Sequence, residues 1–147
     1  MVCTDLSPGM VRLCRRKGLT AHVMDFLGLG FGDRHFAAVF AMNCLLHVPK
    51  ADFRSALGAI RGVLEPGGVF YLGQYGGMDR EGIWADDAYE PKRFFSYLTD
   101  AALRDLVADS FDLADFRRVA VEERDEGVYF QSLVLRRRAR TASSDSP

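Results

Sequence analysis

The sequence predicts an α/β fold: a mostly parallel, Rossmann-like sheet with helices on both faces and an antiparallel hairpin at its C-terminal end. Two observations predict it. Before Phe111, short apolar runs typical of strands alternate with amphipathic stretches typical of helices. After that point come two strand-like segments, Phe111–Val121 and Val128–Arg136, separated by the turn-forming Asp125-Glu126-Gly127.

The first predicted unit is strand, helix, strand. Met1–Asp5 is short and β-prone, and Ser7 can cap a helix whose first turn tolerates Pro8. Three basic residues precede Gly18, where we expect this helix to end. A second strand follows at Thr20–Met24.

The second unit is the clearest β-α-β pattern. Phe36–Met42 is an apolar run typical of a buried strand. Lys50–Leu64 carries apolar residues at intervals of three and four, as an amphipathic helix does. Pro66-Gly67-Gly68 is expected to end the helix through positive φ angles at both glycines, and Val69–Leu72 to form the next strand.

Residues 73–97 are predicted to form an irregular lid or substrate loop. Six aromatic side chains lie in it: Tyr75, Trp84, Tyr89, Phe94, Phe95 and Tyr97. A helix is expected to open at Thr99-Asp100. We assign residues 1–137 to one domain and 138–147 to a disordered tail rich in Ser and Arg.

Composition favours a small partner molecule. The net charge of -1 comes from interspersed acidic and basic residues, which argues against nucleic acid or a membrane surface as partner. Cys3, Cys14 and Cys44 form no CxxC pair, so we expect inert buried thiols in a reducing cytoplasm and no metal site. No apolar run approaches the roughly 18 to 20 residues of a membrane helix, and no signal-peptide pattern is expected.

Four short motifs follow one another along the chain. They are Asp5-Leu6-Ser7-Pro8-Gly9-Met10, Asp25-Phe26, Leu45-Leu46-His47-Val48-Pro49 and Val63-Leu64-Glu65-Pro66-Gly67-Gly68-Val69. In order and spacing they resemble the motifs of class I S-adenosylmethionine-dependent methyltransferases, and Phe94–Asp100 and Phe130–Arg136 extend the resemblance over residues 1–135. The resemblance implies S-adenosylmethionine as cofactor and a small-molecule methyl acceptor.

The resemblance also implies cofactor-binding residues. Asp5, with Leu6 beside it, matches the acidic position that binds both ribose hydroxyls, and a carboxylate suits that task because it only accepts hydrogen bonds. Met10 matches the residue that lies against the adenine ring. The alternatives are that Asp5 only caps the following helix and that Met10 is a core methionine.

Further along, Asp25 matches the acidic residue that binds the adenine amino group, with the backbone amide of Phe26 binding a ring nitrogen. Alternatively, Asp25 only starts a turn. Met42 and Asn43 match positions that border the methionine part of the cofactor and the transfer site. Ala37 departs from the family pattern, where an acidic residue is frequent.

No nucleophilic triad or metal cluster is required for this reaction. Methyl transfer is an in-line displacement in which alignment supplies most of the advantage. His47 is a candidate base because imidazole titrates near neutrality; the alternative is a purely structural histidine.

The family's fold begins with a strand that ends in a Gly-x-Gly-x-Gly turn. No such strand and turn precede Val2 in this sequence. The stretch Gly28–Gly32 has alternate glycines but follows an acidic turn and precedes no helix, so it does not replace that turn. In the family's strand order, 3-2-1-4-5-7-6, this loss leaves Val2–Thr4 and Phe36–Ala41 without their common neighbour. Three outcomes stay open: direct pairing in a distorted sheet, another chain in the gap, or a start that omits coding sequence.

Three hypotheses about function follow. The first is a small-molecule methyltransferase that is N-terminally truncated and inactive if the truncation removes its cofactor loop. The second is a noncatalytic methyltransferase-like module that associates with itself or a partner through exposed sheet edges. The third is another Rossmann-type nucleotide binder, which no phosphate-binding fingerprint supports.

Overall fold

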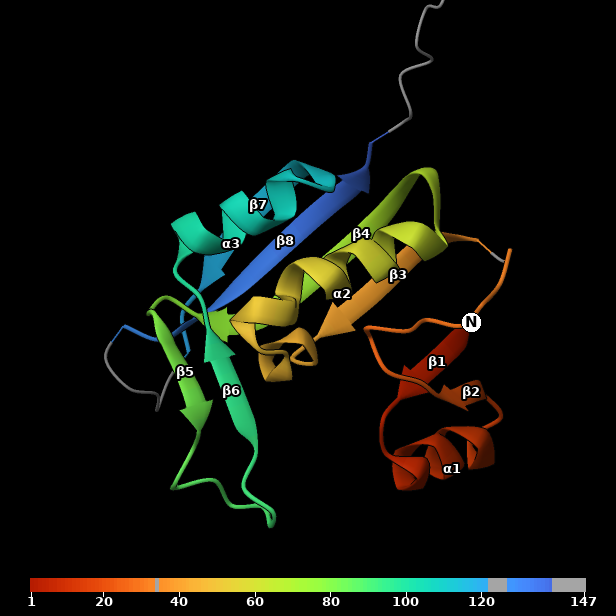
Figure 1. Ribbon diagram of the computed structural model, residues 1–147, viewed down its shortest axis with the longest axis horizontal. Coiled ribbons are helices and arrows are strands. Elements are labelled where there is room, and N and C mark those ends of the chain that lie inside the picture. The colour runs from red at the N-terminus through yellow and green to blue at the C-terminus, as the bar shows by residue number, and fades with distance from the viewer. Residues whose placement is uncertain (34, 122–126, 139–147) are drawn as a thin grey trace, which may run out of the picture.

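A computed structural model describes residues 1–33, 35–121 and 127–138 of the chain (Figure 1). Its N-terminal unit is β1 (Val2–Asp5), α1 (Pro8–Arg16) and β2 (Thr20–Val23), with the two strands paired in parallel. Ser7 caps α1, its Oγ accepting a hydrogen bond from the Met10 amide at 3.3 Å. The Arg15 guanidinium donates to the Ala21 carbonyl at 2.7 and 2.9 Å, which fixes the end of the helix against β2.

The main sheet contains four strands in the order β3-β4-β8-β7. Their bounds are β3 (Phe36–Met42), β4 (Leu64–Gly76), β7 (Phe111–Val119) and β8 (Tyr129–Arg137). The first two strands run parallel, whereas β8 is antiparallel to both of its neighbours. The predicted α/β class, with a parallel part and a C-terminal antiparallel part, is confirmed.

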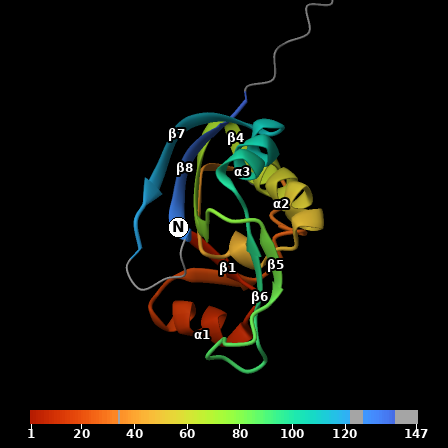
Figure 2. The same cartoon turned by 90° about the vertical axis from the view of Figure 1, so that its left-hand side faces the viewer.

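Two helices, α2 (Lys50–Val63) and α3 (Asp100–Ala108), cover the same face of this sheet (Figure 2). Phe53 of α2 and Leu103 of α3 are fully buried with Phe70 and Leu133 of the central strands in one apolar cluster. The Thr99 hydroxyl caps α3 by accepting from the Ala102 amide at 3.2 Å. The expectation of helices on both faces is therefore not met for the main sheet.

The segment expected to be an irregular lid contains a β-hairpin. Its strands are β5 (Arg80–Ile83) and β6 (Phe94–Tyr97), paired antiparallel. The hairpin extends beyond the main sheet next to η1 (Leu45–His47), a single 3-10 turn after β3 (Figure 1). The prediction of irregular structure was wrong here because strands of four residues are too short to show periodicity.

The two parallel pairs are not joined to each other. In the described parts of the chain, β1 pairs only with β2, and β3 pairs only with β4 on that side of the main sheet. The strands predicted to lack a common neighbour thus each have one open edge. Direct pairing between them, one of the three outcomes considered, is not observed.

Element boundaries differ modestly from those expected. The turn after α2 uses a positive φ of 77° at Gly67, whereas Gly68 has no positive φ, contrary to expectation. Residues 64–68 already belong to β4, which also continues to Gly76.

Of the predicted turn between the last strands, Gly127 has a φ of 89° and Asp125 and Glu126 lie outside the described residues. Arg138 pairs with Asp112 at 2.7 Å, and the rest of the predicted tail lies outside the described residues.

Candidate functional site

The carboxyl ends of β1 and β2 lie side by side. Asp5 is the last residue of β1, and its carbonyl accepts a hydrogen bond from the amide of Met24, directly after β2, at 3.2 Å. Asp25 is the next residue. The two acidic residues predicted to bind an adenosine therefore follow neighbouring strand ends, as loops at the carboxyl edge of a parallel pair do.

The Asp5 carboxylate is partly engaged within its own turn. Its Oδ1 accepts a hydrogen bond from the Ser7 amide at 2.7 Å, so the alternative of a capping role is seen in the geometry. Within the described part of the chain, Oδ2 has no partner. One carboxylate oxygen therefore stays available to a ligand.

Asp25 likewise forms a turn. Its Oδ1 accepts from the Leu27 amide at 3.0 Å, and its carbonyl accepts from the Gly28 amide at 3.2 Å. The side chain is exposed, whereas the next residue, Phe26, is half-buried and packs against the main apolar cluster. Phe26 thus connects the N-terminal unit to the main sheet.

The end of β3 contributes Met42 and Asn43. Asn43 has a φ of 55°, a left-handed conformation, and its amide donates to the Gly73 carbonyl at 2.7 Å. Its Oδ1 is buried and finds no hydrogen-bond partner among the described residues. Such an atom is costly to bury unless something else donates to it, so it is a candidate ligand contact.

Electrostatics relate the end of β1 to the end of β3. Burial raises the pKa of the Cys44 thiol, and the negative charge of Asp5 adds to that increase. Asp5 therefore lies close enough to the residue after Asn43 to act on its charge, although the two strands do not pair.

Three of the predicted cofactor contacts are apolar and unusually exposed. Leu6 is 60% exposed, Met10 is 47% exposed and Met42 is 54% exposed. Met10 is thus not the core methionine considered as an alternative. Exposed apolar side chains at these predicted positions are consistent with a ligand or partner surface.

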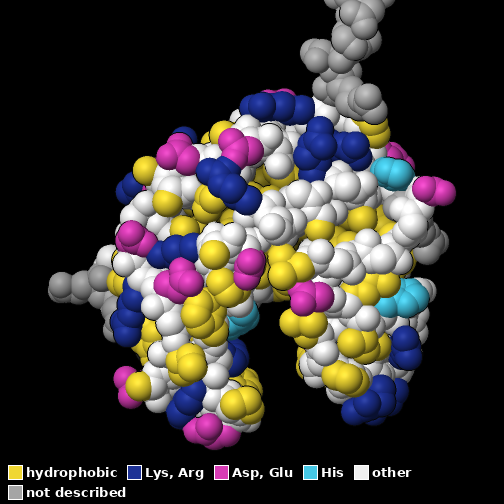
Figure 3. All heavy atoms as spheres, in the orientation of Figure 1, with side chains coloured by type: hydrophobic (Ala, Val, Ile, Leu, Met, Phe, Trp, Pro, Cys, Tyr) yellow, Lys and Arg dark blue, Asp and Glu magenta, His cyan; other side chains and the backbone are white. Residues whose placement is uncertain are grey.

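A cavity of about 420 Å³ lies beside this edge. It is bordered by Asn43, by η1, by the end of β4 and by the hairpin with its connecting loop. His47 lines it, and its Nδ1 lies 2.7 Å from the Phe94 carbonyl, which fixes η1 to β6. With the proton on Nδ1, Nε2 is an acceptor. A notch with hydrophobic side chains on both walls separates the hairpin from the N-terminal unit (Figure 3).

An acidic residue that the sequence did not single out stabilises this cavity. The side chain of Asp87 is only 3% exposed and accepts three hydrogen bonds from Arg93, two from the guanidinium at 2.7 and 2.8 Å and one from the backbone amide at 3.0 Å. These bonds hold the pKa of the Asp87 carboxyl well below its usual range. No motif marks this pair; only the aromatic density of its segment pointed to the region.

Two features are absent from the described residues, 1–33, 35–121 and 127–138. No group of three or more His, Cys, Asp or Glu side chains gathers there to hold a metal ion. No helix in that part of the chain has the length and apolar character needed to cross a membrane.

Comparison with known proteins shows which family and which fold the chain resembles. Residues 1–68 match the family model of a methyltransferase domain, slightly less than half of the 147-residue chain. No curated protein matches the sequence. Among solved structures, a SAM-dependent methyltransferase from Methanosarcina mazei has a TM-score of 0.80 at 17% identity, with 94% of this chain and 82% of that one covered.

Two other structures share the fold. The 1,6-didemethyltoxoflavin-N1-methyltransferase of Burkholderia thailandensis, solved with 1,6-didemethyltoxoflavin and S-adenosylhomocysteine, has a TM-score of 0.72 at 21% identity, covering 93% of this chain and 60% of that one. The cyclase SpnF has a TM-score of 0.73 at 16% identity, covering 94% and 66%. The chain thus spans less than two thirds of both proteins.

The family match and the shared fold confirm the predicted resemblance to class I S-adenosylmethionine-dependent methyltransferases. They do not fix the reaction, because one fold hosts different chemistries, as the presence of a cyclase among these structures illustrates.

Proposed function

We propose that this protein is a methyltransferase that binds S-adenosylmethionine and acts on a small-molecule acceptor. The observation that carries the proposal is that Asp5 and Asp25 stand at the adjoining ends of β1 and β2, while Asn43 at the end of β3 lines a cavity large enough for a small molecule. The methyltransferase family match to residues 1–68, which include all three, supports it. So does the likeness to structures solved with S-adenosylmethionine or S-adenosylhomocysteine.

The residues present fit an adenosine. Asp5 Oδ2 is available to accept from the ribose hydroxyls, and Asp25 and the Phe26 amide offer an acceptor and a donor to adenine. The exposed Leu6 and Met10 offer apolar surface for the ring.

The same fit extends to the transfer site. Met42 offers apolar surface there, and the buried Oδ1 of Asn43 lacks a donor that a ligand would supply. When bound, S-adenosylmethionine supplies a methyl group on a positively charged sulfur, and the acceptor exchanges one proton for that methyl.

The chain contributes positioning and one proton acceptor. The cavity walls hold the acceptor, since alignment is the main source of rate enhancement in such a displacement. His47 is oriented by its bond to Phe94, so Nε2 could take the proton that the acceptor releases. The same bond also serves a structural role by holding η1 to the hairpin.

The free state of Cys3, Cys14 and Cys44 supports placing the protein in the reducing cytoplasm.

A noncatalytic interaction module is the second candidate. The observation that favours it is the open edge on each of β1 and β3, whose backbone groups could pair with a strand of another chain. Sedimentation distinguishes the two candidates: self-association at micromolar concentration supports the module, and a monomer counts against it.

Calorimetric titration with S-adenosylmethionine tests the first candidate. We expect saturable heat of binding, and we expect Asp5→Ala to weaken it about tenfold to a hundredfold, since a hydrogen bond to a charged group contributes about 1.5–3 kcal/mol. Asp105→Ala, at an exposed position of α3, is the matched control and should bind as the parent does. Absence of binding by the parent chain would contradict the proposal.

A further inference from the structure

The cavity next to η1 has walls made largely of aromatic rings. Its volume of about 420 Å³ falls in the range of about 300–1,000 Å³ that is usual for small-molecule sites. Trp84, Phe95 and Tyr97 come from the hairpin, and His47 comes from η1, which contacts β6. A site of this size suits one small molecule.

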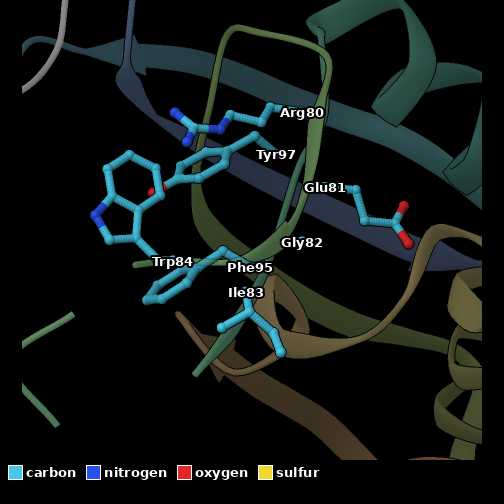
Figure 4. A pocket seen from close by; sticks show the side chains of 7 residues that line it. All are labelled: Arg80, Glu81, Gly82, Ile83, Trp84, Phe95 and Tyr97. Atoms are coloured by element: carbon cyan, nitrogen blue, oxygen red, sulfur yellow. The ribbon is translucent and has the colours of Figure 1, made fainter. Parts of the chain in front are cut away.

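The rings form a continuous cluster. Phe95 and Tyr97 are stacked, with planes 11° apart and centroids separated by 6.1 Å, and Trp84 lies 5.9 Å from Tyr97. The His47 ring meets Phe95 edge-on at 4.9 Å. Figure 4 shows the three hairpin rings together, with Glu81 directed away from them. Such a cluster offers ring faces and edges to a planar ligand.

A cation covers one side of this cluster. The Arg80 guanidinium lies 4.3 Å from the centre of the Trp84 ring, in the smaller cavity of about 120 Å³ that shares the three hairpin rings. This contact restrains the indole from one side. The larger cavity is thus bordered by a ring that is held in place before any ligand arrives.

The loop that carries Trp84 is also fixed. The Trp84 amide donates to the Arg93 carbonyl at 3.1 Å, and the Trp84 carbonyl accepts from the Asp87 amide at 3.2 Å. Asp87, whose side chain is buried, and Arg93 then form the ion pair described above. A preformed wall lowers the entropy cost of binding a rigid ligand.

The polar atoms of the cavity define what the ligand must carry. The charges of Asp87 and Arg93 are paired with each other, so they call for no net ligand charge. Besides this pair, the cavity presents acceptors on three side chains: the exposed carboxylate of Asp86, Oδ1 of Asn43, which is buried without a partner among the described residues, and Nε2 of His47. A hydroxyl or amino group satisfies an acceptor; an ether does not.

We propose that this cavity binds a planar aromatic molecule bearing a hydroxyl or amino group, and that such a molecule is the methyl acceptor. The second part rests on the proposed function. The donor atom faces Asn43 and His47, and the proton it gives up on methylation passes to Nε2 of His47 or to water.

Three probes test this inference by calorimetry on the unmodified chain: 1-naphthol, its saturated counterpart decahydro-1-naphthol, and 1-methoxynaphthalene. We expect 1-naphthol to bind at least fivefold more tightly than the saturated alcohol, because a puckered ring loses the contacts to the aromatic cluster, worth about 0.5–1.5 kcal/mol for each ring pair. We expect a similar preference over the methoxy compound, which has no donor. Equal affinity for the three probes would overturn the proposal.

A variant locates the binding site. Trp84→Leu should weaken 1-naphthol binding about tenfold, whereas Tyr89→Leu, on the same loop but 62% exposed and outside both cavities, should leave it unchanged. Equal binding by the Trp84 variant and the parent would also overturn the proposal. Melting curves identify a variant that fails to fold, and the three-probe comparison does not depend on any variant.

Separate titration with S-adenosylmethionine distinguishes this inference from the proposed function. Selective 1-naphthol binding without cofactor binding supports the aromatic site and removes its role in methyl transfer. Cofactor binding without selectivity among the probes supports the function and overturns the acceptor class inferred here.

Discussion

At the scale of single residues, some side chains of the candidate site were identified from sequence motifs, and others were identified only from the structure. Asp5 and Asp25 were identified from the sequence because each stands at the end of a predicted strand, at a spacing shared with a known family. Asp87 and Arg93 were not, because two residues six positions apart in an irregular segment have no periodic signature. Their importance depends on burial, which no local pattern reveals.

The Asp87–Arg93 pair makes stability depend on pH. The unfolded carboxyl titrates at about 3.9, and the pKa of the folded one lies below that value. A lowered pKa contributes stability that is complete above the unfolded value and is lost as the pH falls through the folded one. We therefore expect Asp87→Asn to unfold at lower urea concentration than the parent at pH 7, with a difference that shrinks as the pH approaches 2.

Urea titrations at several pH values measure this dependence, and Asp105→Asn serves as an exposed control that should show little difference at any pH. A constant gap between parent and Asp87 variant from pH 7 to pH 2 would show that the ion pair is not the cause.

At the scale of elements, helices with strong apolar periodicity were predicted almost to the residue. Lys50–Leu64 became α2 at Lys50–Val63, because its buried residues recur on one face and strong turn residues follow. The hairpin β5–β6 was missed, since four-residue strands carry too little pattern and their pairing depends on contacts between distant segments. The strand order of the main sheet, β3-β4-β8-β7, corresponds to the segment 4-5-7-6 of the family's strand order.

For two glycines near the end of α2, replacement by alanine is expected to change the free energy of unfolding in opposite directions. A Cβ at Gly68 would lie 2.8 Å from the Glu65 carbonyl oxygen and 3.1 Å from that of Ala37, so Gly68→Ala forces the β3–β4 junction apart. We expect a loss of about 1–3 kcal/mol in the free energy of unfolding. Gly62→Ala is the matched control, at an exposed helical site with open space around it, and should gain up to about 1 kcal/mol.

Urea or thermal unfolding of both variants measures these changes. Equal effects from the two substitutions would mean that the close approach at Gly68 is absent in solution.

At the scale of the whole molecule, the N-terminal unit and the main sheet are distinct in their hydrogen bonding. No residue of β1 is fully buried, whereas Leu133 and Leu135 of β8 are, and β8 is paired on both sides. The sequence predicted the open edges of β1 and β3 through a family strand order. It did not predict that helices would cover only one face of the main sheet, since periodicity shows that a helix packs but not on which side.

The separate hydrogen bonding of the N-terminal unit and the main sheet predicts that the two differ in local stability. Native-state hydrogen exchange should show β1 and β2 amides opening at a free energy at least about 1.4 kcal/mol lower than those of β4 and β8, a tenfold difference in protection. Mass spectrometry of peptides from each region measures it. Equal protection in both regions would mean that the N-terminal unit and the sheet unfold together.

The position of β8 has a consequence for biosynthesis. It follows every other described strand in the sequence, yet it lies between β4 and β7. On the ribosome, the nascent chain therefore exposes an unpaired edge of β4 until Tyr129–Arg137 emerge. The main sheet is completed only after translation of its last strand.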